Sequence, residues 1–141
     1  MSDSANRERL LSLLTIVNKM YADEPMTATL IQKLLFLCQK KLPSCNVKYN
    51  YRVGHFGPFS KELAEDLAAL KATGVIEIDN GLKVKVTKPE TINHPASDEL
   101  RDEIITQFPD TETIVLAALT TPDVHGKRVG RDIELTPRQH P

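Results

Sequence analysis

Hydrophobic residues in the first forty positions recur every three or four residues, as on one face of a helix. This spacing predicts a helix over about 4–21, with Ser4 as its N-cap. Pro25 interrupts the pattern, and Thr27 then stands at the N-cap position of a second helix over 28–41. We therefore expect two helices joined by a short polar connection and packed at an angle.

From residue 47 the hydrophobic period changes from helical spacing to two. Apolar and aromatic residues alternate with Lys48, Asn50 and Arg52, which predicts a half-buried strand over 47–53. Five of the seven aromatic residues of the chain are concentrated around this strand. We expect this aromatic-rich insertion to supply the bulky part of the core.

A third helix is predicted by the leucine spacing that begins at Leu63. It follows a turn at 57–60, with Gly57 or Ser60 as its cap, and Gly74 ends it in a left-handed conformation. Three of its exposed charges are the carboxylates of Glu62, Glu65 and Asp66. The helix therefore presents an acidic face.

A β-hairpin is the clearest local pattern after this helix. Two β-prone runs, 75–78 and 82–86, flank Asn80-Gly81, a pair that favours a type I′ turn because both positions need positive φ. In the second run the pattern places the apolar residues, Leu82 included, toward the core and the lysines toward water.

Two more helices are predicted after a linker at 89–95, one from Ser97 to about 107 and one from Asp110 to about 120. The apolar fifth helix can pack on the domain or on a second copy, so a homodimer is possible. Residues 121–141 hold three prolines, two glycines and no aromatic residue. We expect one domain over 1–120 and a mostly flexible tail over 121–141, with a short extended piece at 129–135.

The predicted order of three helices and a hairpin is that of a winged helix. The fold class is therefore α+β and mostly helical: a winged helix with an aromatic-rich insertion between the second and third helices, extra C-terminal helices and a flexible tail. The insertion of about 18 residues departs from a plain helix-turn-helix, which has a turn of three or four residues there.

Two sequence stretches also resemble a known family. They are IQKLLFL at 31–37 and GPFSKEL at 57–63, followed by the leucine and glycine spacing up to Ile76. Over residues 8–88 the chain is similar to prokaryotic winged-helix proteins related to the Panacea (SocA-like antitoxin) domain, with His55-Phe56 where tyrosine is usual. The resemblance implies functions that range from toxin neutralisation through protein contact to DNA binding.

The net charge of -1 excludes a protein that attracts nucleic acid through its overall charge. The charge is unevenly distributed, because residues 31–90 carry ten basic and six acidic side chains. We expect these basic residues to contact the phosphates of double-stranded DNA without reading bases, or else to form a solvated edge that prevents aggregation. The candidate nucleic-acid-binding residues are Lys40, Lys41, Lys48, Arg52, Lys83, Lys85 and Lys88.

A protein-interaction adaptor is the alternative function, with no nucleic acid involved. The acidic third helix opposes base reading, since like charges at an interface cost several kcal/mol by the general estimate. The aromatic rings are either contact residues or core packing, in which Phe36 covers the underside of the 47–53 strand. The candidate partner-binding residues are Phe36, His55, Phe56, Phe59, Glu62, Glu65 and Asp66.

Enzyme chemistry finds little support in the sequence. It has no glycine-rich phosphate loop and none of the H-E-x-x-H, G-x-S-x-G or C-x-x-C motifs. Cys38, Cys45 and His55 lack a zinc-binding spacing, so we expect no metal and no cofactor. We expect both cysteines to be reduced thiols.

No apolar run approaches the roughly 20 residues that span a bilayer, and the first residues are polar. A cytoplasmic protein without a membrane partner is expected. The leading hypothesis is a prokaryotic, non-catalytic DNA-binding regulator of transcription or an antitoxin-like protein, and the adaptor is its rival.

Overall fold

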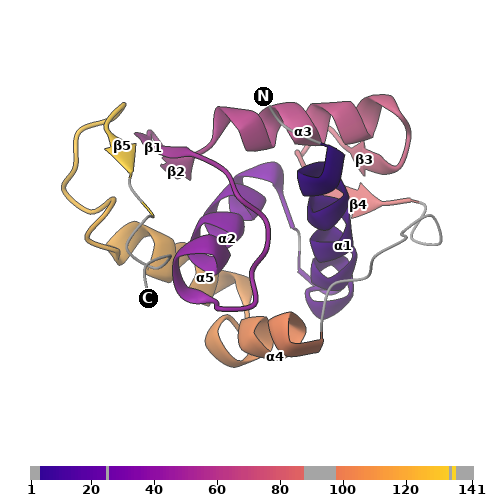
Figure 1. Cartoon of the computed structure of the whole chain (residues 1–141), viewed down its shortest axis with the longest axis horizontal. Coiled ribbons are helices and arrows are strands. Elements are labelled where there is room, and N and C mark those ends of the chain that lie inside the picture. Colours follow the sequence, from indigo (N-terminus) through magenta and orange to yellow (C-terminus); the bar gives the residue numbers. More distant parts are fainter. Residues whose placement is uncertain (1–3, 25, 88–97, 134, 136–141) are drawn as a thin grey trace.

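The computed structural model describes residues 4–24, 26–87, 98–133 and 135, and these form an α+β structure that is about half helical (Figure 1). The helices are α1 (Ser4–Met20), α2 (Ala28–Lys41), α3 (Lys61–Ala72), α4 (Asp98–Gln107) and α5 (Thr111–Thr120). The strands are β1 (Tyr51–Gly54), β2 (Gly57–Phe59), β3 (Ile76–Ile78), β4 (Val84–Val86) and β5 (Asp132–Ile133). Lys88, Ser97 and the linker expected at 89–95 lie outside the described residues.

All five predicted helices are confirmed, together with three of their N-caps. The side chains of Thr27, Ser60 and Asp110 each accept a hydrogen bond from a backbone N–H of the first helical turn. Of the two caps considered for α3, the structure has Ser60. Gly74 ends α3 as predicted, with φ +81°, and the N–H groups that follow the helix bond back to its last carbonyls.

α2 is the central element of the molecule (Figure 1). Every residue from 31 to 38 is buried, because α5 and the β1–β2 hairpin cover the side that the sequence pattern shows as polar. Phe36 lies in this core, and its ring meets that of Tyr51 edge-on at a centroid distance of 5.5 Å. Phe36 therefore packs beneath the strand and is not available as a surface contact.

The strand predicted over 47–53 keeps its alternation of buried and exposed residues, but only its second half pairs with other strands. β1 is the middle strand of an antiparallel sheet with the order β2-β1-β5. In the 47–50 segment, side chains provide hydrogen-bond partners for the backbone in place of a neighbouring strand. The amide of Asn6 exchanges two hydrogen bonds with the backbone of Lys48, and the amide of Gln39 does the same with Tyr49.

The turn expected at 57–60 lies further toward the N-terminus. His55 and Phe56 form the tip of the β1–β2 hairpin, and residues 57–59 are strand β2. Gly57 has φ +114°, and a Cβ there would lie 3.1 Å from Leu119 Cδ2. A glycine is therefore required where β2 crosses α2 and α5.

The β3–β4 hairpin is confirmed, but the predicted type I′ turn is wrong. Neither Asn80 nor Gly81 has a positive φ, whereas Leu82 has φ 66°. The Asp79 carboxylate accepts hydrogen bonds from the N–H groups of Gly81 and Lys83, and this stabilises a three-residue loop with a left-handed third residue. Leu82 consequently points outward and is 52% exposed, contrary to the expectation that it faces the core.

The chain remains in contact with the helical core beyond residue 120. Thr121 and Val124 are buried, and the extended piece expected within 129–135 is confirmed as β5. β5 pairs with β1 in an antiparallel register that places Ile133 opposite Tyr51. Part of the segment expected to be a flexible tail thus supplies the third strand of the sheet.

The buried amide of Gln32 is expected to be essential for stability. It accepts from the Ser60 N–H at 2.7 Å and donates to the Ser60 carbonyl at 2.9 Å. Gln32→Leu leaves the Ser60 N–H buried without a partner, while the Ser60 carbonyl keeps its bond from the Ala64 N–H. We therefore expect the free energy of unfolding to fall by about 2 kcal/mol, measured by urea denaturation. Gln107→Leu, at an exposed position, is the control and should change it by less than about 0.5 kcal/mol. Equal losses in the two variants would contradict this role.

Candidate functional site

An open groove of about 700 Å³ lies where α3, the start of α2 and the two hairpins meet. α3 contributes Ala64, Leu67, Ala68 and Lys71, whose spacing places them on one face of the helix. Ala28 of α2 also lines the groove. Because three of these residues are alanines, the helical walls leave open space between them.

Large apolar side chains gather at this groove. Phe56 is 77% exposed and Phe59 47%, and both come from the β1–β2 hairpin. Leu82 of the β3–β4 loop and Val129, which precedes β5, are about half exposed. All four line the groove, which is thus the main concentration of exposed apolar surface in the described part of the chain.

The ionisable residues that line the groove are Arg52, His55 and Lys71, and none of the lining residues carries a carboxylate. Arg52 forms an ion pair with Asp132 at 3.2 Å, in which both side chains are largely exposed. An exposed pair of this kind contributes little to stability. The groove is therefore apolar inside and basic at its edge.

The structure separates the predicted partner-binding residues into three groups. His55, Phe56 and Phe59 lie together at the groove, whereas Phe36 lies in the core. On α3, Glu65 is exposed, and Glu62 accepts a hydrogen bond from the Asn50 N–H at 3.0 Å. The acidic residues of α3 do not line the groove, although Glu62 borders a second pocket together with Phe59.

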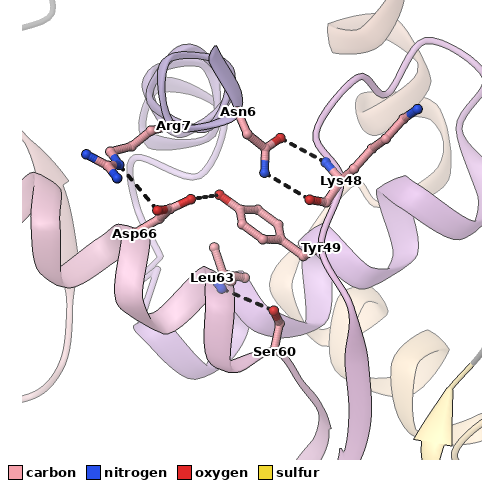
Figure 2. Close-up of polar contacts among 7 residues, drawn as sticks. All are labelled: Asn6, Arg7, Lys48, Tyr49, Ser60, Leu63 and Asp66. Atoms are coloured by element: carbon pink, nitrogen blue, oxygen red, sulfur yellow. Dashed lines mark hydrogen bonds and ion pairs between the residues drawn. The ribbon is translucent and has the colours of Figure 1, made fainter. Parts of the chain in front are cut away.

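Asp66 is not on the exposed face of α3, so that expectation is wrong. It is 1% exposed, lies 3.2 Å from Arg7 Nε in an ion pair, and accepts a hydrogen bond from the Tyr49 hydroxyl at 2.7 Å (Figure 2). Burial and this bond to Asp66 raise the pKa of Tyr49 well above its usual range. Asp66 thus links α1, α3 and the 47–50 segment, which is a structural role.

The predicted phosphate-binding residues do not form one surface. Lys83 and Lys85 are exposed on the β3–β4 hairpin, at the end of the molecule where the N–H of Ala28 bonds to the Leu82 carbonyl. Lys40 lies at the other end of α2, about 18 Å further along its axis, and is ion-paired with Asp123.

The other predicted basic residues are also spread out. Lys41 is exposed beside Lys40, and exposed Lys48 lies near the start of α1. Arg52 borders the groove. Lys88 is outside the described residues.

Burial shifts the pKa of two reactive groups. It lowers the pKa of Lys33 and raises that of the Cys38 thiol. Neither Cys38 nor Cys45 forms a disulfide. Within the described residues there is no cluster of His, Cys, Asp or Glu side chains that could hold a metal ion. None of the helices described here is long and apolar enough to cross a membrane.

Comparisons with protein-family models, curated proteins and solved structures gave no match to the chain. The resemblance to winged-helix antitoxin-like proteins therefore stays a prediction, and so does the winged-helix arrangement itself.

Replacement of Tyr49 and of Tyr51 by phenylalanine should affect the free energy of unfolding differently. Tyr49→Phe removes a hydrogen bond to a buried carboxylate, and we expect the free energy of unfolding to fall by about 2 kcal/mol. The Tyr51 hydroxyl is buried and has no hydrogen-bond partner in the described residues, so Tyr51→Phe should leave stability unchanged or raise it by about 1 kcal/mol. Urea denaturation of both variants tests this pair, and a larger loss for Tyr51→Phe would contradict it.

Proposed function

We propose that the protein is a non-catalytic interaction module that binds a segment of a partner protein in this groove. The observation that carries the proposal is Phe56, an exposed aromatic ring at the edge of an apolar groove. Aromatic side chains that anchor into or beside such grooves supply much of the energy of protein interfaces. Contiguous apolar surface of this kind also marks interaction sites on proteins.

The hairpin holds Phe56 in a defined position. The tip is only two residues long, and Gly54 pairs with Gly57 directly below it. Gly57 cannot be replaced without strain, because of its positive φ and its contact with Leu119. A ring on such a short, fixed turn loses little conformational freedom on binding, which favours affinity.

DNA binding remains the second candidate, supported by the exposed Lys83 and Lys85 on the β3–β4 hairpin. In the winged-helix arrangement that we proposed from the sequence, this hairpin is the wing. Against this candidate, Glu77 lies directly opposite Lys85 in the strand register. With Lys40 paired to Asp123, few basic side chains are left to neutralise phosphates from one surface.

Selection from a random peptide library displayed on phage tests the groove function. Phe56→Ala removes a contact ring and Ala68→Gln fills the groove. We expect the affinity of the selected peptides to fall at least about tenfold in each variant. Leu116→Ala removes another exposed apolar side chain, on α5 and outside the groove, and should have no effect. The proposal would be overturned if no peptide is enriched, or if neither groove variant weakens binding of the selected peptides.

Fluorescence anisotropy of a labelled generic duplex distinguishes the two candidates. At about 50 mM salt we expect no binding that depends on the hairpin, so the Lys83→Ala, Lys85→Ala double variant should match the wild type. Binding that weakens in the double variant and disappears near 200 mM salt would instead support DNA binding through the hairpin.

A further inference from the structure

We infer that the segment bound in the groove is an acidic amphipathic helix of the partner protein. The inference rests on the proposed function and adds the chemistry and conformation of the occupant. Three properties of the groove carry it: the pairing of β1 on both sides, the small side chains on the helical walls, and the sign of the charges at the rim.

The strand β1 beside the groove offers no place for an added strand. β1 has β2 on one side and β5 on the other, so its backbone is already paired. An extended peptide therefore cannot pair with β1, although strand pairing is the usual way that an extended peptide is bound.

The helical walls suit a partner helix. Ala64, Leu67 and Ala68 form a shallow apolar face on α3, and Ala28 lies on the wall formed by α2. Small side chains on two walls leave room for the apolar ridge of an incoming helix, whose anchors recur at i, i+3, i+4 and i+7. Phe56 and Leu82, both more than half exposed, would cover the sides of that ridge.

The charge of the rim favours an acidic helix. Lys71 and Arg52 border the groove with His55, and none of its lining residues is acidic. The ion pair of Arg52 with Asp132 is largely exposed, so Lys71 is the rim cation on which the charge argument mainly rests. α2 also begins at the groove, with no acidic residue in its first turn, so the helix dipole adds partial positive charge there. Carboxylates that flank the apolar ridge of the partner would meet opposite charge at this rim, and lysines would be repelled.

The strand β5 runs away from this groove. The N–H of Gly130 bonds to the carbonyl of Val53 at the groove end of the sheet. From there β5 runs antiparallel to β1, and its last residue, Ile133, lies opposite Tyr51 at the far end of that strand.

Two matched synthetic peptides test the inference. Both are 14 residues long and fluorescein-labelled, with the same leucine ridge at i, i+3, i+4 and i+7; one carries glutamates beside the ridge and the other lysines at the same positions. In fluorescence anisotropy at about 50 mM salt we expect the glutamate peptide to bind at least about tenfold more tightly, with a smaller difference near 200 mM. Lys71→Glu should reduce that preference about fivefold or more, whereas Lys41→Glu, at an exposed site outside the groove, should not.

The outcomes separate this inference from the proposed function. If both peptides bind equally and Ala68→Gln abolishes the binding of both, the acidic preference is overturned but the groove function is supported. Tighter binding of the lysine peptide, or no binding of either, would also overturn the inference. In those cases the phage selection still decides whether the groove binds protein segments, because its library is not biased toward helices or acidic residues.

Discussion

Backbone groups of residues 47–50 have no strand partner among the described residues, and side chains supply the hydrogen bonds that a neighbouring strand would otherwise provide. Asn6 serves Lys48, Gln39 serves Tyr49, and Glu62 accepts from the Asn50 N–H (Figure 2 shows the first of these). A buried backbone group without a partner destabilises the fold by about 1–3 kcal/mol. The path of the chain between α2 and β1 therefore depends on a few amide and carboxylate side chains that come from α1, α2 and α3.

The same arrangement recurs at two other places and fixes how the hairpins sit on the helices. Gln32 of α2 bonds both backbone groups of Ser60, and Asn18 of α1 bonds Val84 and Val86 of β4. Each amide has an NH2 group that donates and a carbonyl oxygen that accepts, so it can bond both the C=O and the N–H groups of an extended backbone. Short strands can thus dock on helices without a wide sheet, and the groove lies between the two hairpins that are held in this way.

Local signals in the sequence were sufficient to predict the helices, because caps and breaks act within one turn. Thr27, Ser60 and Asp110 cap the helices that follow them, and Gly74 closes α3. The β3–β4 loop was assigned the wrong turn because Asp79 competes for the N–H groups of the turn, an effect that the Asn-Gly pair alone does not show. That one difference moves Leu82 from the core to the groove.

Long-range partners explain most of what the sequence could not predict about the candidate site. Asp66 fits a solvated acidic face when α3 is considered alone, and only the approach of Arg7 and Tyr49 buries it. The opposite holds at the groove, where Arg52 and Lys71 are nineteen positions apart in sequence and both line the same groove. Counting charges along the chain gave a basic middle segment and suggested phosphate contact.

In the folded structure the basic residues of that segment lie at separate places. Lys40 is neutralised by Asp123, and Lys83 and Lys85 lie on a hairpin with a facing glutamate. The basic side chains that remain at the groove border the exposed rings of Phe56 and Phe59. An amphipathic partner surface fits a cation beside an exposed aromatic ring better than a uniform phosphate backbone does. Burial of the ring contributes favourable binding free energy only when apolar atoms cover it. Of the described residues that pointed to DNA in the sequence, Arg52 alone lines the groove, so their positions support the proposed protein partner better than a single phosphate-binding surface.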